Sequence, residues 1–250
     1  MINFGEYKYK MTLERNGKIV EFITNIQKQI DIFKEKLKKY CIHYDFRNKF
    51  SKVKVLGEGA FGIVHEIKNN KTGECFAAKH FLKEKLEEDD IKLLKNEILI
   101  MRGLNHPHIL NIHEIHESSH DIILVLDLMK DGELDTFLKN KKNLITENFI
   151  KNIIREGLLA LKHLNSKGVI HRDIKPENIL IEYDENCHKK IHIKISDFGL
   201  SVFQGKEICC PGAGTPGFMP PEVANYKSYS INQLTSKIDI FSLGVIFFKM

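Results

Sequence analysis

The string HRDIKPEN, at His171–Asn178, constrains this chain more than any other feature of its sequence. Its side chains suit a reaction centre. Asp173 can accept a hydroxyl proton, Lys175 can neutralise a nearby negative charge, and Asn178 offers an oxygen to a hard cation such as Mg²⁺. A proton acceptor, a cation and an oxygen ligand for a metal ion thus lie within one short segment.

A glycine-rich loop lies upstream, where Gly57, Gly59 and Gly62 belong to the string GEGAFGIV. Glycines allow backbone N–H groups to approach phosphate oxygens closely. Dinucleotide-binding folds use a similar string, but there a helix follows the third glycine. Here the extended run IVHEI follows, and HRDIKPEN has no role in a dinucleotide fold. The sequence therefore favours a strand–turn–strand flap over a nucleotide.

A lysine and a glutamate lie between the glycine loop and HRDIKPEN. Lys79 belongs to the strand-like run FAAKH, and Glu97 belongs to a helix predicted over about Asp89–Gly103. Either residue alone would be interpreted as a solvated surface group. A lysine that holds phosphates on an apolar strand needs an anionic partner to orient it. The order of the motifs therefore favours an ion pair between the strand and the helix.

These strings, in this order, resemble the eukaryotic protein kinase domain from about Ser51 to Met250. The triplet Asp197-Phe198-Gly199, which follows the run IHIKIS, is similar to the metal-binding triplet of that family. Lysine at position 175 resembles the Ser/Thr-specific branch. The resemblance implies an α+β fold with two lobes, a β-rich N-lobe over residues 51–128 and a mainly helical C-lobe over residues 132–250.

The resemblance also implies a role for each site residue. Asp173 would be the catalytic base, Lys175 would clamp the phosphoryl group, and Asn178 and Asp197 would bind Mg²⁺. The residues implied to bind ATP are Leu56, Gly57, Gly59, Gly62, Val64, Ala77, Lys79, Glu97, Asp127, Met129, Glu133 and Leu180. Asp239, in the string DIFSLG, is expected to bond the backbone of the catalytic loop.

The resemblance places Leu126 at the gatekeeper position and Asp127–Met129 at the hinge that bonds adenine. Glu133 leaves two interpretations open. It would meet the ribose hydroxyls of ATP, or with Glu177 it would favour basic residues upstream of the target Ser or Thr.

The activation segment reads LSVFQGKEICCPGAGTPGF and has no Ser, Thr or Tyr between Ser201 and Thr215. The customary phosphoacceptor position falls on Pro211, so we predict that phosphorylation of this segment is not the switch. The string Gly-Thr-Pro-Gly and the missing acceptor are similar to features of calcium/calmodulin-dependent kinases. Cys209 and Cys210 are expected to be bystanders in this loop.

Residues 1–45 precede the kinase-like region. A hairpin is predicted over residues 7–24 around Asn16-Gly17, followed by an amphipathic helix over 26–40 and a linker over 41–50. This unit weakly resembles the end of a pleckstrin-homology domain. The alternative is a hairpin-plus-helix extension that packs on the small lobe. Strands that would hold a phosphoinositide are absent, so no specific lipid binding is expected.

The large lobe is expected to be truncated. By resemblance, further helices would follow the apolar segment that ends at Met250, so the domain would lack its last helices.

Composition excludes several other classes of protein. The formal charge is +5, from 38 basic and 33 acidic residues, and the lysines are scattered, so no nucleic-acid partner is expected. No apolar run approaches the ~20 residues that a membrane helix needs. Five cysteines without a disulfide framework indicate a reducing compartment. The spacing of Cys187, His188 and His192 fits no standard zinc pattern. We therefore expect a soluble, intracellular and cytoplasmic protein.

The sequence thus predicts a protein serine/threonine kinase that transfers the γ-phosphate of ATP, with Mg²⁺, to Ser or Thr of protein substrates. The alternative is a catalytically weak truncated kinase or pseudokinase that serves as a nucleotide- or partner-binding module. The intact catalytic residues favour the enzyme, and only the expected truncation favours the binding module.

Overall fold

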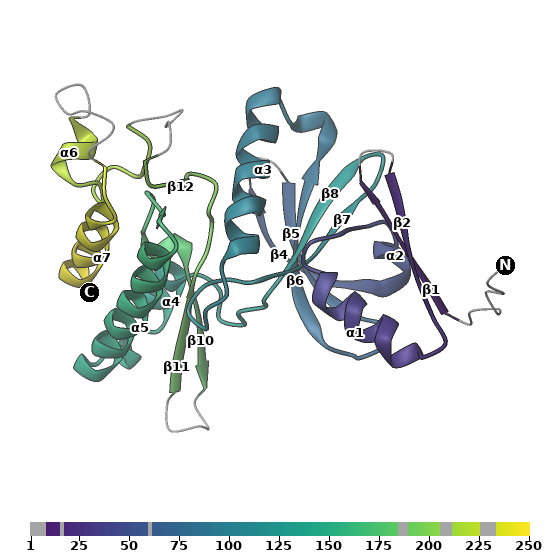
Figure 1. Ribbon diagram of the computed structural model, residues 1–250. Coiled ribbons are helices and arrows are strands. Elements are labelled where there is room, and N and C mark those ends of the chain that lie inside the picture. Colours follow the sequence, from purple (N-terminus) through teal and green to yellow (C-terminus); the bar gives the residue numbers. More distant parts are fainter. Residues whose placement is uncertain (1–8, 16–17, 60–61, 185–189, 206–211, 226–233) are drawn as a thin grey trace, which may run out of the picture.

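The computed structural model describes residues 9–15, 18–59, 62–184, 190–205, 212–225 and 234–250. These residues form a strand-rich lobe and a mainly helical lobe, which lie side by side (Figure 1). The α+β, two-lobed fold predicted from the sequence is confirmed. Expectations for Asn16-Gly17, Cys187, His188 and Cys209–Pro211 fall outside the described residues.

The N-terminal segment begins with two strands and a helix, β1 (Tyr9–Arg15), β2 (Lys18–Thr24) and α1 (Gln27–Leu37). The strands pair antiparallel, with Tyr9 opposite Thr24. Helix α1 buries Ile30, and the ring of Phe33 lies 4.7 Å from that of Phe22 in β2. The helix thus covers one face of a hairpin that is too small to be stable alone.

The segment that links this unit to the next, residues 41–50, has secondary structure of its own that the sequence did not reveal. It contains β3 (Ile42–His43), which pairs parallel with a strand of the main sheet, and α2 (Phe46–Lys49). Helix α2 buries Phe46, whose ring lies 5.5 Å from that of Phe50. Elements of this length show no hydrophobic period, so only their tertiary partners reveal them.

In the described part of the chain, the largest sheet has the order β3-β7-β8-β6-β5-β4. Its other strands are β4 (Phe50–Gly59), β5 (Gly62–Asn69), β6 (Cys75–Leu82), β7 (Ile112–Glu117) and β8 (Asp121–Leu126). These strands pair antiparallel with one another. Helix α3 (Glu88–Gly103) follows β6 and lies beside the sheet at the boundary with the other lobe (Figure 1).

The second lobe is built around α5 (Glu147–Ser166), whose N-cap Thr146 accepts a hydrogen bond from Phe149 N. Its other elements are α4 (Leu134–Asn140), β9 (Val169–Ile170), β10 (Ile179–Asp184), β11 (Lys190–Ile195), β12 (Val202–Phe203), α6 (Pro221–Ala224) and α7 (Lys237–Lys249), with 3₁₀ turns at Lys83–Lys85, Lys142–Leu144 and Pro176–Asn178. Helix α5 contacts β11 and α7, and β10 pairs with β11. Of the helices in the described ranges, none is long and apolar enough to cross a bilayer.

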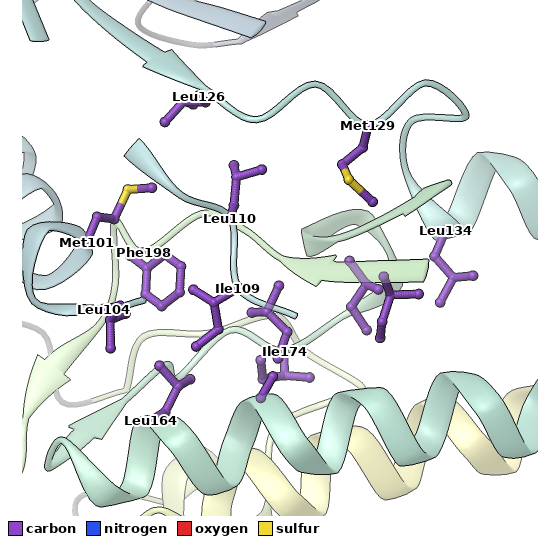
Figure 2. Packing of buried hydrophobic residues seen from close by; sticks show 14 of the residues in the cluster. Met101, Leu104, Ile109, Leu110, Leu126, Met129, Leu134, Leu164, Ile174 and Phe198 are labelled. Atoms are coloured by element: carbon purple, nitrogen blue, oxygen red, sulfur yellow. The ribbon is translucent and has the colours of Figure 1, made fainter. Parts of the chain in front are cut away.

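One apolar cluster continues from the small lobe into the large lobe. Figure 2 shows Phe198 between Met101 and Leu104 at the end of α3 and Ile109 and Leu164 on the other side. Phe198 is fully buried. Because Phe198 follows Asp197 directly, this packing fixes the position of that carboxylate between the lobes.

Candidate active site

Strand β6 and helix α3 bring Lys79 and Glu97 together. Lys79 Nζ donates a hydrogen bond to Glu97 Oε1 at 3.1 Å, and it lies 4.0 Å from Asp197 Oδ1. Burial lowers the pKa of Lys79, but the carboxylates of Glu97 and Asp197 raise it more, so the net direction is upward. The ammonium group therefore stays charged. It is held between β6, which carries it, Glu97 of α3 and Asp197 of the large lobe.

The position of α3 is also tied to the segment after Asp197. Asn96, next to Glu97, donates from Nδ2 to the carbonyl oxygen of Ser201 at 2.7 Å. This contact joins the helix to the second lobe and was not found from the sequence, because an asparagine on a helix carries no distinctive signal. The helix is thus held where Glu97 reaches Lys79.

Replacement of Glu97 by Gln is expected to lower kcat/KM for ATP by about 10²-fold, because Lys79 loses the charge that orients it. Steady-state kinetics at varied ATP concentration measure this loss. The matched control is Glu88→Gln, an exposed position at the start of the same helix. Unchanged kcat/KM in Glu97→Gln would remove the ion pair from the proposed machinery.

The glycine loop joins two strands, as predicted. Gly57 and Gly59 lie in β4, and Gly59 pairs with Gly62 at the start of β5. Residues 60–61 at the tip lie outside the described ranges. A Cβ added at Gly62 would lie 1.7 Å from the carbonyl oxygen of His80 in β6. Only glycine permits this approach of two backbones.

A cavity of about 430 Å³ lies beneath this loop. Its lining includes the predicted site residues Gly62, Val64, Lys79, Glu97 and Asp197, and from the α3 side Leu86, Leu93 and Leu94. Of the apolar residues predicted to meet adenine, Val64 lines it, whereas Leu56, Ala77, Met129 and Leu180 do not. The cavity is therefore the phosphate end of the predicted site, extended toward α3.

The catalytic loop gathers a carboxylate, an ammonium and a hydroxyl. Lys175 Nζ lies 2.9 Å from Asp173 Oδ2 and donates to Thr215 Oγ1 at 2.8 Å, while the Thr215 hydroxyl donates to Asp173 Oδ1 at 2.6 Å. Burial raises the pKa of Asp173, but the hydrogen bonds from Thr215 and Lys175 outweigh it and hold the pKa below its ordinary value. Asp173 is thus ionised at neutral pH and can accept a proton.

Asn178 and Asp197 provide oxygen atoms that fit Mg²⁺. Asn178 donates from Nδ2 to the backbone oxygen and to Oδ2 of Asp173, at 2.8 and 2.9 Å. Its amide nitrogen is thus engaged, so the amide oxygen is the atom of this side chain that could bind a cation. The side chain of Asp197 is 52% exposed, so its carboxylate is accessible. A carboxylate and an amide oxygen are ligands that a hard cation prefers.

Asp239 of α7 bonds the backbone of the catalytic loop, as expected. Its carboxylate accepts hydrogen bonds from the backbone N–H groups of His171 and Arg172, both at 2.8 Å. Arg172 and Asp197 have φ angles of 73° and 61°, in the left-handed region that non-glycine residues rarely adopt. Such strained residues persist only where surrounding contacts hold them.

The segment predicted as the hinge connects β8 to the second lobe, and its first side chain is already engaged. Asp127 Oδ2 accepts hydrogen bonds from Lys194 Nζ and Asn111 N, each at 2.8 Å, and Oδ1 lies 2.8 Å from His113 Nε2. Burial raises the pKa of Asp127, but these hydrogen bonds outweigh it and lower the pKa. A ligand at Asp127 would therefore meet its backbone.

The apolar residues predicted around adenine are only partly brought together. Val64, Ala77, Met129 and Leu180 all belong to the main apolar cluster. Leu56 does not, since it is 43% exposed and lies on the outer strand β4. The structure thus brings four of these five side chains to the boundary between the lobes.

Glu133 and Glu177, the two acidic residues considered for substrate preference, lie close enough for their charges to interact. Glu133 is the N-cap residue of α4, and its backbone forms a bridge with Leu180. Burial, then the charges of Glu177 and Asp135, raise the pKa of Glu133. This repulsion between carboxylates would be relieved by a cation.

Thr215 was noted from the sequence only as part of the activation segment, not as a contact of the catalytic carboxylate. Its signal was the string Gly-Thr-Pro-Gly, but the residue it meets, Asp173, lies 42 positions earlier. A Cβ added at the preceding Gly214 would lie 2.8 Å from the carbonyl oxygen of Arg172. The two segments therefore approach closely, and that approach is a property of the fold.

Comparison with known proteins agrees with this geometry. The family model described as "protein kinase domain" matches residues 50–250. The chain is 36% identical to mouse (Mus musculus) serine/threonine-protein kinase 33 over 202 residues, which are 78% of this chain and 40% of that protein. It is also 36% identical to a probable myosin light chain kinase of Dictyostelium discoideum over 192 residues, covering 76% of this chain and 47% of that protein.

A third relative is CBL-interacting serine/threonine-protein kinase 20 of Arabidopsis thaliana, with 36% identity over 207 residues that cover 81% of this chain and 44% of that protein. The chain spans less than half the length of these curated relatives. The family model covers most of the chain, and all three relatives are named as kinases. The chain therefore belongs to the protein kinase domain family, in its serine/threonine-specific branch.

Proposed function

We propose that this chain transfers the γ-phosphoryl group of ATP to the hydroxyl group of Ser or Thr in protein substrates. The observation that supports this most directly is the network of Asp173, Lys175 and Thr215, in which an ionised carboxylate is held by an ammonium and a hydroxyl. All members of the network are intact, which favours an enzyme over a pseudokinase that only binds nucleotide or partners.

In this mechanism the oxygen of the substrate hydroxyl attacks the γ-phosphorus, and the bond from that phosphorus to the bridging oxygen of ADP breaks. Asp173 accepts the hydroxyl proton. Lys175 neutralises negative charge on the transferred group. Lys79, oriented by Glu97, binds the phosphates of ATP. Since the phosphoryl transition state needs little covalent assistance, positioning and neutralisation provide most of the catalysis.

Asn178 and Asp197 are the residues proposed to hold Mg²⁺, which when bound supplies positive charge against the phosphates. Residues Gly57, Gly59 and Gly62 bring backbone N–H groups toward the same phosphates. Val64, Ala77, Met129 and Leu180 provide the apolar surface proposed for adenine, with Leu56 at its outer edge and the Asp127 backbone as its polar contact.

Basic residues upstream of the target hydroxyl are the proposed substrate feature. The raised pKa of Glu133, caused by burial and then by Glu177 and Asp135, supports this assignment, because a substrate cation would relieve the repulsion. Cytoplasmic action is proposed as well. The free thiols of Cys41 and Cys75 are consistent with a reducing compartment.

Residues 1–45 are proposed to be an extension that lies outside the kinase domain. The domain itself is proposed to have its N-lobe over residues 51–128 and its C-lobe over residues 132–250. Hydrogen bonds at the end of the extension support attachment to the small lobe, because Lys39 Nζ donates to Leu104 O at 2.7 Å and Arg102 Nε donates to Lys39 O at 3.0 Å. Its relation to a pleckstrin-homology domain stays a prediction.

The proposal is tested with labelled ATP, Mg²⁺ and matched peptides that carry upstream arginines and differ only in the acceptor, Ser, Thr or Tyr. We expect label on Ser and Thr and none above background on Tyr. A fourth peptide, with Ser as acceptor and the arginines replaced by alanines, tests whether Glu133 and Glu177 favour basic residues upstream of the acceptor. Background is set by the variant Asp197→Asn, which loses a proposed metal ligand.

Two results would contradict the proposal. Saturable ATP binding by folded protein without transfer to any peptide would favour a nucleotide-binding module. Equal transfer to Tyr would contradict the Ser/Thr assignment.

A further inference from the structure

Three side chains meet in the large lobe, and none of them is assigned to ATP, Mg²⁺ or phosphoryl transfer. His108 comes from the loop between α3 and β7, Glu156 from the middle of α5, and His192 from β11. Their ligand atoms all lie within 4.8 Å of one another. Within the ranges that the structure describes, they are the group of three His, Cys, Asp or Glu side chains that could hold a metal ion.

Two of the three separations between ligand atoms are close to the edge of a tetrahedral metal site, and all three are within 4.8 Å. His108 Nδ1 lies 3.2 Å from Glu156 Oε2, and His192 Nδ1 lies 3.6 Å from the same oxygen. Zinc binds imidazole nitrogen at about 2.0–2.1 Å and carboxylate oxygen at about 2.0–2.2 Å, so two ligands of one tetrahedral ion are roughly 3.3–3.5 Å apart. Two histidines and a glutamate are also a ligand set that zinc sites use.

Backbone contacts already hold the central carboxylate in place. Ile193 N donates to Glu156 Oε2 at 2.9 Å, and His108 Nδ1 lies 3.3 Å from the carbonyl oxygen of Ile193. Arg155 is the nearby cation, with its guanidinium 3.8 Å from Glu156 Oε1, on the side of the carboxylate away from both imidazoles. The His108 contact ends at the nitrogen that would bind the ion, so zinc would replace the proton on that nitrogen and this hydrogen bond.

The group is buried on two sides and accessible on the third. The side chains of Glu156 and His108 are 7% and 12% exposed, whereas that of His192 is 32% exposed. His192 also lines a second cavity, of about 330 Å³, that opens beside β11. An ion could therefore enter from the His192 side and keep a water molecule as its fourth ligand.

Further imidazoles surround the group. His106 accepts a hydrogen bond at Nδ1 from His108 N at 3.2 Å, and its ring stacks on that of His163 in α5 at 5.0 Å. His163 Nε2 is buried and has no hydrogen-bond partner among the described residues. These contacts brace the loop that carries His108 against the same helix that carries Glu156.

We propose that His108, Glu156 and His192 form a Zn²⁺ site that joins α5, β11 and the loop between α3 and β7. Without the ion, the same side chains form an ordinary hydrogen-bonded group, and the experiment must separate these two states. The site is independent of the proposed phosphoryl transfer, since none of its residues belongs to that machinery. Its expected effect is on the stability of the large lobe.

Thermal unfolding of chelator-treated protein tests the site, measured at pH 7.5 with excess Mg²⁺ and increasing zinc chloride. At a hundredfold excess over its Kd, zinc is expected to raise Tm by roughly 5–10 °C. Cobalt(II) provides a second measurement, because a four-coordinate ion at this site would give an intense visible absorption that zinc abolishes. Excess Mg²⁺ keeps the proposed catalytic metal site out of the measurement.

Two variants of the proposed ligands and two controls locate the ion. His192→Gln, at the accessible side, and Glu156→Gln, which still accepts the Ile193 hydrogen bond, are each expected to weaken zinc binding by at least about 10-fold. The control His120→Gln changes an exposed histidine and should keep the full shift. The double variant Cys187→Ser with His188→Gln should keep it too.

The proposal would be overturned by any of three results. They are the absence of saturable stabilisation by zinc, an undiminished shift in folded His192→Gln, and loss of the shift in the double variant.

Discussion

Replacement of Asp173 by Asn is expected to lower kcat by about 10²–10⁴-fold, the range that a general base contributes. An amide cannot accept the hydroxyl proton. Its NH₂ group would also face donors, because Thr215, Lys175 and Asn178 all donate hydrogen bonds to this carboxylate. The substitution therefore removes the base and disorders the network around it, while ATP binding through Lys79 should persist.

Initial rates of transfer to a Ser peptide, together with Kd for ATP and Tm, separate these effects. The matched control is Asp89→Asn, which makes the same change at a side chain that is 87% exposed on α3. We expect wild-type kinetics in the control and a selective loss of kcat in Asp173→Asn. Wild-type kcat in the folded Asp173→Asn protein would exclude Asp173 as the base.

Replacement of Asp239 by Asn is expected to destabilise the protein by about 2–4 kcal/mol, the range for a buried charged hydrogen-bond acceptor that loses a partner. Asp239 is 2% exposed, and each of its oxygens accepts a backbone N–H from the catalytic loop. Asparagine keeps one acceptor and turns an NH₂ group toward the other N–H. Arg172, with φ of 73°, would lose the contact that holds its strained backbone.

Thermal unfolding should show this as a decrease in Tm of roughly 5–15 °C. Activity measured well below Tm should fall too, because the backbone of His171 and Arg172 leads directly into Asp173. The two variants thus separate loss of the catalytic base from loss of support for the catalytic loop. Asp173→Asn should reduce kcat with little change in Tm, whereas Asp239→Asn should lower Tm. An unchanged Tm in Asp239→Asn would show that other contacts hold the loop.

The sequence was informative where the chemistry is local. Asp173, Lys175 and Asn178 lie in one segment, so their types and spacing alone indicated a reaction centre. The pairing of Lys79 with Glu97 was predictable because their order between two motifs restricts the partners. Periodicity located the amphipathic helix predicted over residues 26–40, which the structure shows as α1 (Gln27–Leu37). It failed for residues 41–50, where each element is too short to show a period.

Contacts between distant segments needed the tertiary structure. Neither the bond from Thr215 to Asp173 nor the approach of Asn96 to Ser201 has a signature along the chain. His192 is the clearest case. Its neighbours in sequence, Cys187 and His188, fit no zinc pattern, whereas its spatial neighbours His108 and Glu156 come from two other elements.

The sequence by itself determined the type of chemistry and the order of the motifs, because side-chain types are read directly along the chain, and the resemblance that those motifs carry implied the two-lobed α+β fold. The tertiary structure alone decided which hydroxyl meets Asp173, how Asn96 joins α3 to the second lobe, and where His108, Glu156 and His192 converge. Those outcomes depend on how helices and strands pack a continuous core, and packing joins residues whose separation along the chain carries no information about their distance in space.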